Sequence, residues 1–266
     1  MNPPYVRPQH VNRHYANYPS LADRSVLISG GTTGIGASFV EHFVAQGAKV
    51  AFLGRNQNAA ETLIAGLKKS AAHLPVFLPC DVCNIEALQI AIARARDFCG
   101  PISVLINNAA NDARHSVEET TVESWDNGIA VNLRHQFFAA QAVLPDMQSL
   151  GGGSIINLGS TSWKIKVGGM PVYTISKSAI QGLSRSLARD FGPHNIRVNT
   201  LVPGWVMTEK QLKMWVDDSG NRAIDENQCL QARLDSADIS RMALFLAADD
   251  SKMCTAQDFI VDGGWI

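Results

Sequence analysis

The chain lacks the features that mark membrane and nucleic-acid-binding proteins. Its 266 residues contain no apolar run of about 20 residues, the length that crosses a bilayer, so we expect no membrane span. Its net charge is only −1, so we expect no nucleic acid as a partner. It has five cysteines, an odd number, which favours reduced thiols and a cytoplasmic protein.

Metal-binding patterns are also missing. The seven histidines show no H-E-x-x-H or similar spacing, so we expect no bound metal. Cys80-Asp81-Val82-Cys83 has the spacing C-x-x-C, but Cys80 ends an expected strand, which argues against a zinc or redox site. Residues 1–20 have no apolar core and are not expected to be a secretory signal; we expect an N-terminal arm outside a domain of residues 21–266.

Apolar strands alternate with helical stretches along most of the chain. This alternation predicts a single α/β domain of the Rossmann type, a doubly wound parallel sheet with helices on both faces. Strands are expected at 25–29, 49–53, 76–80, 103–107, 154–158, 197–202 and 259–261, and helices at 37–46, 85–98, 122–149, 172–191 and 237–248.

A polar insertion at residues 206–233 interrupts this rhythm after the sixth strand. Ligands of such sheets bind beyond the carboxyl ends of the strands, where this insertion would fold. We therefore predict a substrate lid, with an ordinary surface excursion as the alternative.

A glycine-rich turn, Gly30-Gly31-Thr32-Thr33-Gly34-Ile35-Gly36, separates the strand Ser25–Ser29 from the first helix. Glycines let the backbone approach a pyrophosphate, and the N-terminus of a helix attracts its negative charge. The order strand, glycine turn and helix predicts a dinucleotide site, the alternative being a turn without a ligand.

The end of the second strand bears on which dinucleotide is bound. The strand Lys49–Leu53 is followed by Gly54-Arg55-Asn56, with no acid to hold the 2′-hydroxyl of NAD. Arg55 is instead placed to pair with a 2′-phosphate. We therefore favour NADP, with NAD left open and a solvated Arg55 as the alternative.

Tyr173 and Lys177 lie four residues apart, a spacing that puts both on one face of a helix. A nearby ammonium favours phenolate and lowers the pKa of tyrosine from its usual value of about 10. Ser160, thirteen residues upstream, is placed to hold the reacting oxygen. The three residues predict a base that takes a proton from an alcohol. The spacing of Tyr173 and Lys177 by itself is also compatible with a solvent-exposed pair that has no catalytic role.

In this order, the motifs resemble the short-chain dehydrogenase/reductase family over roughly residues 20–266. The family pattern T-G-x-x-x-G-I-G matches Ser29–Gly36 with serine for threonine, and N-N-A-G matches Asn107–Ala110 with alanine for the last glycine. Asp81-Val82 matches the adenine-side pair, and Pro203-Gly204 matches the P-G after the sixth strand. The resemblance implies an NAD(P)-dependent oxidoreductase acting on CH–OH groups, assembled as a homotetramer.

By this resemblance the catalytic residues are Asn132, Ser160, Tyr173 and Lys177. Tyr173 acts as the base, Lys177 lowers its pKa and binds the nicotinamide ribose, and Ser160 holds the reacting oxygen. Asn132 holds a water that links Lys177 to solvent, and hydride passes to nicotinamide C4. The cofactor-binding residues implied are Gly30, Thr32, Thr33, Gly34, Ile35, Gly36, Arg55, Asn56, Asp81, Val82, Asn108, Ala109, Ala110, Tyr173, Lys177, Pro203, Gly204, Val206 and Thr208.

Polar residues are dense just past the fourth and fifth strands, in Asn107–His115 and Ser160–Trp163. A steroid or acyl pocket would be mostly apolar, so this density favours a polyhydroxylated ligand. For the stretch Asn111–His115, the alternative is a turn in which Asp112 and Arg114 pair with other protein groups. The predicted substrate residues are Asn111, Asp112, Arg114, His115, Ser160, Ser162, Trp163, Tyr173 and Trp205.

These segments, with Val131–His135 and the ending Asp262–Trp265, resemble bacterial aldose 1-dehydrogenases that act on D-xylose, L-arabinose or L-rhamnose. The resemblance implies oxidation of the anomeric hydroxyl to an aldonolactone. The xylose enzymes carry an acid after the second strand, where this chain has Gly54-Arg55. The alternatives are an enzyme for a polyol, a ketone or a 3-oxoacyl thioester, and a cofactor-binding regulator without catalysis, although the chain keeps all four catalytic positions.

Overall fold

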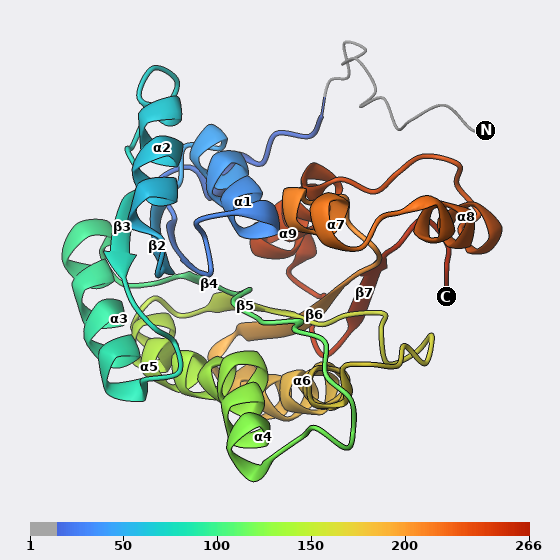
Figure 1. Ribbon diagram of the computed structural model, residues 1–266. Helices are drawn as coiled ribbons and strands as arrows, with labels where there is room; N and C mark the ends of the chain where they lie inside the picture. Colours follow the sequence, from blue (N-terminus) through green and yellow to red (C-terminus); the bar gives the residue numbers. More distant parts are fainter. Residues whose placement is uncertain (1–14) are drawn as a thin grey trace.

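Seven parallel strands form the centre of the computed structural model, which describes residues 15–266 (Figure 1). Their order across the sheet is β3-β2-β1-β4-β5-β6-β7. The predicted α/β fold is confirmed, and each predicted strand is present with ends within one residue of those expected. The strands are β1 (Ser25–Ser29), β2 (Lys49–Gly54), β3 (Val76–Pro79), β4 (Val104–Asn107), β5 (Gly153–Leu158), β6 (Ile196–Pro203) and β7 (Asp258–Val261).

The sheet is buried on both faces because successive side chains of a strand point to opposite sides. In β1, Val26 and Ile28 join one apolar cluster and Leu27 joins the other. Helices α1 (Gly34–Ala45), α2 (Gln57–Leu67) and α9 (Ser236–Ala247) cover the first face, and α3 (Ile85–Cys99), α5 (His135–Ser149) and α6 (Pro171–Phe191) cover the second.

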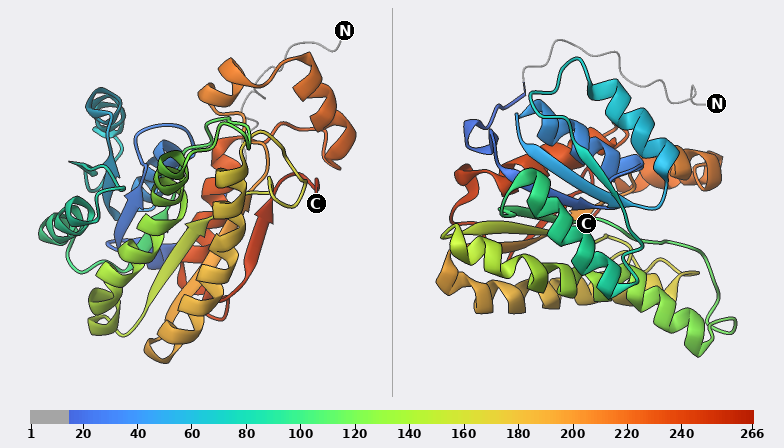
Figure 2. Two further views of the ribbon diagram at one scale, coloured as in Figure 1. Left: turned by 60° about the horizontal axis from the view of Figure 1, so that its bottom comes forward. Right: turned by 90° about the vertical axis from the view of Figure 1, so that its left-hand side faces the viewer.

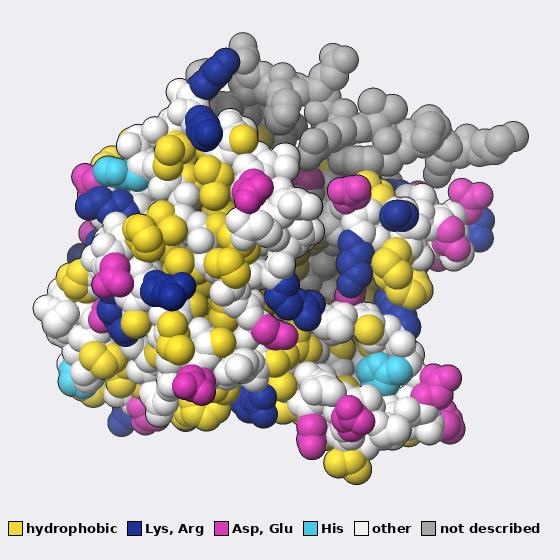
Figure 3. Space-filling view, turned by 60° about the vertical axis from the view of Figure 1, so that its left-hand side comes forward, with side chains coloured by type: hydrophobic (Ala, Val, Ile, Leu, Met, Phe, Trp, Pro, Cys, Tyr) yellow, Lys and Arg dark blue, Asp and Glu magenta, His cyan; other side chains and the backbone are white. Residues whose placement is uncertain are grey.

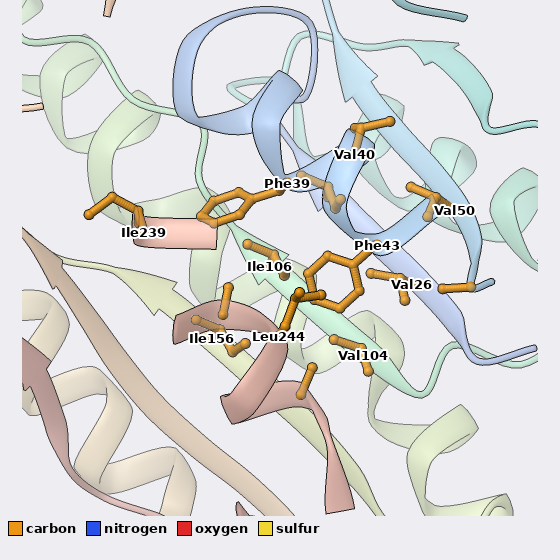
Figure 4. Packing of buried hydrophobic residues seen from close by; sticks show 14 of the residues in the cluster. Val26, Phe39, Val40, Phe43, Val50, Val104, Ile106, Ile156, Ile239 and Leu244 are labelled. Carbon is orange, nitrogen blue, oxygen red and sulfur yellow. The ribbon is translucent and has the colours of Figure 1, made fainter. Parts of the chain in front are cut away.

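Figure 4 shows the packing under α1. The ring of Phe43 lies among Val26, Val104 and Ile106 of the sheet and Leu244 of α9, all of them buried. This cluster fixes α1 against the sheet and thereby holds the glycine turn that precedes α1.

The helix expected over residues 122–149 is divided into three parts. It consists of α4 (Val122–Ile129), a π-helical turn η2 (Ala130–Arg134) and α5. A π-turn inserts one extra residue into a helix and often occurs at a functional site. Here it carries Asn132, whose buried side chain bonds out of the helix.

One helix outside the polar insertion, α2, was not predicted. Its Ala60 is buried and Leu63, Ile64 and Leu67 pack against the core. The helix begins after Asn56, whose Oδ1 accepts from the Ala59 N–H at 3.1 Å. Single 3₁₀ turns also occur at η1 (Pro19–Leu21), η3 (Gly192–His194) and η4 (Asp249–Ser251).

The polar insertion folds into two short helices, α7 (Glu209–Met214) and α8 (Asp218–Asn227). Figure 2 shows both helices beyond the carboxyl ends of the strands, close to the loops that follow β4 and β5. This position agrees with a lid over the ligand site, and the lid function stays a prediction. Residues 206–233 are called the lid below.

The described part of the N-terminal segment packs on the domain. Leu21 is fully buried, and Tyr18 packs against the cluster around α1 while its N–H donates to Gln46 Oε1 at 2.7 Å. The rest of the arm predicted over residues 1–20 lies outside the described residues. The boundary of the folded region therefore precedes residue 21.

Two further properties concern the outside of the molecule. Among the described residues, no helix is both long enough and apolar enough to cross a membrane.

On the face in Figure 3, Lys and Arg side chains are interspersed with Asp and Glu and with apolar side chains, rather than gathered by charge.

Candidate active site

Three of the predicted catalytic residues meet at a cavity of about 370 Å³ beyond the ends of β5 and β6. Ser160 follows β5, and Tyr173 and Lys177 lie one turn apart on α6. Lys177 is only 2% exposed, and its Nζ donates to the carbonyl of Leu158 at 2.6 Å. The same Nζ lies 5.5 Å from the centre of the Tyr173 ring, so phenol, ammonium and hydroxyl share one site.

Burial shifts the pKa values of the pair in opposite directions. Burial raises the pKa of Tyr173 to about 12, and the groups that oppose this rise are the Ser160 hydroxyl and the Arg114 charge. Burial also lowers the pKa of Lys177 to about 7. The expectation that the ammonium lowers the pKa of Tyr173 is not met, because the protein interior disfavours both charged forms.

Asn132 is buried, and its side chain ties the loop after β4 to α4. Its Oδ1 accepts from the Asn111 N–H at 2.8 Å, and its Nδ2 donates to the carbonyls of Asn111 at 3.1 Å and Gly128 at 3.0 Å. These contacts position the loop that carries Asp112 and Arg114. That Asn132 holds a water stays a prediction.

A second hollow, a groove of about 330 Å³, runs along the glycine turn. Gly30 has φ +67°, and a Cβ on it would lie 2.8 Å from Ala109 Cα. A Cβ on Gly36 would lie 1.9 Å from the carbonyl oxygen of Gly30, so neither position admits a side chain. The backbone therefore lines the groove itself.

The N-terminus of α1 opens into this groove. Its N-cap, Thr33, makes no side-chain cap, so the first N–H groups of the helix keep their capacity to donate. Such donors and the positive end of the helix dipole suit an anionic pyrophosphate. The groove thus fits a dinucleotide.

Ser29 stands where the family pattern has threonine, and its hydroxyl bonds to the loop after β4. Its Oγ accepts from the N–H groups of Asn108 at 3.0 Å and Ala109 at 3.1 Å. In return, Asn108 Nδ2 donates to the carbonyls of Ser29 at 3.1 Å and Gly30 at 2.9 Å. Ala110 is exposed and has no positive φ, so alanine fits where the family has glycine.

Groove and cavity are continuous, since both are lined by Ile35, Asn108, Ala110, Asp112 and Thr208. Every predicted cofactor residue lines the groove, the cavity or the neighbouring hollow around Arg55, except Gly34. A Cβ on Gly34 would lie 3.4 Å from Thr208 Cγ2, so Gly34 lies under the start of the lid.

Arg55 stands at the far end of the groove. Its side chain is exposed, and its Nη1 lies 3.9 Å from Asp81 Oδ2. The hollow beside it is lined by Thr32, Asn56, Gln57 and Asn58, at the start of α2.

The structure brings six of the nine predicted substrate residues to the cavity: Asp112, Arg114, Ser160, Ser162, Tyr173 and Trp205. Asn111, His115 and Trp163 do not line it. Asn111 Oδ1 accepts from the Ala113 N–H at 3.2 Å, the His115 ring faces the backbone of Ala113 and Val172, and the Lys164 ammonium covers the Trp163 ring. Asn111 and Trp163 thus have contacts within their own loops, and His115 joins its loop to the start of α6.

Asp112 lines the cavity but pairs with the lid. One carboxylate oxygen bonds to the Lys210 ammonium, and the other accepts from Gln211 Nε2 at 2.8 Å. Against the effect of burial, the hydrogen bond and charge of Lys210 lower the pKa of Asp112. The guanidinium of Arg114 lies 4.9 Å from the centre of the Trp215 ring. Both residues therefore line the cavity and also pair with other protein groups, and their contact with a substrate stays a prediction.

Ser162 and Trp163 each have a buried polar atom without a hydrogen-bond partner in the described structure, and of the two only Ser162 lines the cavity. The residue is 5% exposed, and its Oγ is buried without a hydrogen-bond partner in the described structure. Its N–H donates to Ser160 Oγ at 3.1 Å, which fixes the turn. A buried hydroxyl without a partner is costly unless a ligand supplies one.

Sequence reasoning missed several lining residues. Ile165, Val167 and Met170 come from the loop after β5, Gln211 and Ala223 from the lid, and Trp265 from the end of the chain. Of these residues, only Trp265 could have been found from the sequence, as a large aromatic side chain directly after two glycines. The others line the cavity because their loops fold back over it, which local sequence does not indicate.

Comparison with known proteins decides the family. A family model described as Enoyl-(Acyl carrier protein) reductase matches residues 30–266. The D-xylose 1-dehydrogenase of Caulobacter vibrioides is 42% identical over 94% of this chain and 98% of its own. The chain belongs to the short-chain dehydrogenase/reductase family.

Other members of the family support this assignment. A protein of Rhizobium meliloti named as a probable galactose dehydrogenase, GalD, is 44% identical over 94% of this chain and 97% of its own. A blue fluorescent protein from a metagenomic library, solved in complex with NADPH, is 30% identical with a TM-score of 0.85 over 92% of this chain and 99% of its own. As a short-chain dehydrogenase/reductase, the protein is an oxidoreductase acting on CH–OH groups with a nicotinamide cofactor.

Proposed function

We propose that this short-chain dehydrogenase/reductase oxidises an aldose at C1 to the aldonolactone, with NADP as the electron acceptor. The observation that carries the proposal is the cavity that Ser160 and Tyr173 share with Ser162, a residue whose buried hydroxyl has no partner in the described structure. Three hydroxyl groups around one cavity suit a ligand that presents several hydroxyls of its own. The relatives named for galactose and D-xylose support the same substrate class.

In the proposed reaction, Tyr173 takes the proton of the anomeric hydroxyl and Ser160 donates a hydrogen bond to the same oxygen. Asn132 orders the loop beside them through its bonds to Asn111. A bound nicotinamide cofactor supplies the hydride acceptor. Because burial raises the pKa of Tyr173 to about 12, base catalysis near neutral pH needs the bound cofactor and substrate to lower this pKa.

Cofactor binding is assigned to the groove, with the nicotinamide end reaching into the cavity beside Lys177. The N-terminus of α1 would hold the pyrophosphate, Asp81 and Val82 the adenine side, and Lys177 the nicotinamide ribose. Arg55 would pair with the 2′-phosphate of NADP, because its guanidinium is exposed beside the N-terminus of α2. The segment Gly54-Arg55-Asn56 after β2 has no Asp or Glu that would bind the 2′-hydroxyl of NAD.

Replacing Arg55 tests the cofactor proposal. Charge-assisted hydrogen bonds contribute about 1.5–3 kcal/mol, so Arg55→Ala is expected to raise the KM for NADP by about 10- to 100-fold. The KM for NAD should change little. Initial rates with both cofactors measure this, and an unchanged preference would show that Arg55 does not select the phosphate.

The substrate proposal is tested by initial-rate formation of reduced cofactor. The panel holds D-xylose, L-arabinose, D-galactose, L-rhamnose, L-fucose and D-glucose, each with NAD and NADP. Saturable turnover of one sugar is expected, with the lactone as product. Turnover of a ketone or a 3-oxoacyl thioester but of no aldose would reject the proposal and keep the family.

We further propose a cytoplasmic homotetramer. Trp125 of α4, Phe137 of α5 and Ile175 of α6 are 40%, 43% and 45% exposed, so each of these three helices presents a large apolar side chain to solvent. Covering them with α4–α6 of a second copy would bury this surface. Sedimentation equilibrium should give four times the chain mass.

A further inference from the structure

The last residues of the chain return to the cavity. Trp265 lines it together with Trp205 of the loop after β6. The ring centres are 6.4 Å apart and the ring planes are inclined by 49°, so the two indoles form the sides of an angle rather than a stack. Both residues are half-buried.

One carboxylate fixes Trp265 from both sides. Asp262 is 5% exposed; its Oδ1 accepts from the Gly264 N–H at 2.8 Å and its Oδ2 from the Ile266 N–H at 2.9 Å. Gly263 and Gly264 have φ of +72° and +85°, values that L residues rarely adopt. This turn aims Trp265 at the cavity.

Trp205 is fixed by a chain of side-chain hydrogen bonds. Its Nε1 donates to Gln211 Oε1 at 2.9 Å, and Gln211 Nε2 donates to Asp112 Oδ2 at 2.8 Å. The polar atom of the indole is therefore satisfied within the protein, and the ring offers a ligand its apolar surface.

We propose that Trp205 and Trp265 form an aromatic corner that holds the C–H face of the sugar ring. Gln211 and Asp262 act as positioning residues that set the angle between the indoles. The inference rests on the proposed function and adds the element that recognises the sugar. A pyranose carries its hydroxyls around an apolar ring face, so an aromatic surface complements the face while Ser162 remains for a hydroxyl.

Trp265→Ala is the first test, with Ile266→Ala as the matched control. Ile266 is the next residue of the tail, its side chain is exposed, and alanine keeps the N–H that Asp262 holds. Trp265→Ala is expected to raise the KM for the preferred aldose by about tenfold, the equivalent of about 1.4 kcal/mol. The kcat should stay within about threefold and the Kd for NADP should not change, because a residue that contacts only the sugar contributes equally to binding the ground state and the transition state. Trp265→Phe should recover much of the affinity.

A second variant keeps the test independent of the tail. Gln211→Leu removes the acceptor of Trp205 Nε1 and the donor to Asp112 Oδ2, and leaves Asp262 and Trp265 untouched. A severalfold rise in the KM for the aldose, with the same Kd for NADP, is expected. Asp112→Ala, which removes the contact with Asp112 but keeps the acceptor of Trp205, is the matched control and should raise the KM less.

The outcomes separate this inference from the proposed function. If wild type oxidises an aldose and folded Trp265→Ala has the wild-type KM, the aromatic corner is wrong and the function stands. If Trp265→Ala does not fold, an unchanged KM for the aldose in folded Gln211→Leu would reject the corner in the same way. A wild type that oxidises no aldose would reject both.

Discussion

The two sides of the cavity are held in place by different kinds of contact. On the catalytic side, buried side chains bond to backbone: Lys177 to the Leu158 carbonyl and Asn132 to both backbone groups of Asn111. On the lid side, side chains bond to side chains, as Asp112 does to Lys210 and Gln211, and Lys210 is half exposed. Backbone partners are present whatever side chain a position carries, whereas the side-chain contacts of the lid are lost when one of a few residues is substituted. The chemistry is thus fixed more firmly than the recognition of the substrate.

The largest expected effect comes from the catalytic side. Tyr173→Phe removes the base and keeps the ring, so turnover should fall by about 10²- to 10⁴-fold. Cofactor affinity should remain, because the backbone of the groove is untouched. Single-turnover rates and fluorescence titration with NADPH measure the two quantities. A variant that keeps its turnover would show that the Tyr173 hydroxyl is not the base.

A smaller effect should appear in stability as a function of pH. The pKa of Lys177 is about 7 in the folded protein and about 10.4 when unfolded, so the unfolded chain binds more protons between these values. The free energy of unfolding should therefore rise with pH across this window, by on the order of 1 kcal/mol per unit. Tyr173 acts oppositely above pH of about 10, because the unfolded phenol ionises first.

Lys177→Met provides the control for this pH dependence. It removes the titrating group and leaves a side chain of similar length, so the rise between pH 7 and about 10 should flatten in urea unfolding measured at several pH values. An equal slope in wild type and variant would contradict a lowered pKa of Lys177.

The smallest effect is expected at the lid. Asp112→Asn keeps the shape of the side chain but removes the charge that pairs with Lys210. Exposed ion pairs contribute up to about 1 kcal/mol, so the KM for sugar and cofactor should rise by no more than about fivefold, with little change in kcat.

A double-mutant cycle with Lys210→Met sharpens this measurement. If the two residues act through one contact, the double variant should behave like either single variant. Fully additive effects would mean that Asp112 contacts the substrate by itself. Additivity would therefore support Asp112 as a residue that recognises the substrate.

The sequence was sufficient for the features that depend on local pattern. Strand ends were predicted within one residue because apolar runs and glycine turns delimit them, and the spacing of Tyr173 and Lys177 fixed their common helix face. Asn132 in a π-turn was not predictable, since an extra residue in a helix leaves the hydrophobic pattern almost unchanged. The pKa of Tyr173 was predicted in the wrong direction because burial cannot be read from the spacing of two residues.

Contacts between distant segments were the other limit. Asp112 and Lys210 are 98 residues apart, and nothing near either residue indicates the partner. The predicted substrate set therefore included Trp163, which packs within its own loop, and omitted Trp265, which the Asp262 turn brings back to the cavity.

The continuity of groove and cavity has a consequence for inhibitor design. Because Asp112 and Thr208 line both, the proposed function implies that a single compound joining a dinucleotide-like head to a sugar-like ring would occupy both at once. The head would contact the residues that match the family motifs, and the ring would contact the lid and Trp265. Selectivity for this enzyme over its relatives would have to be built into the ring.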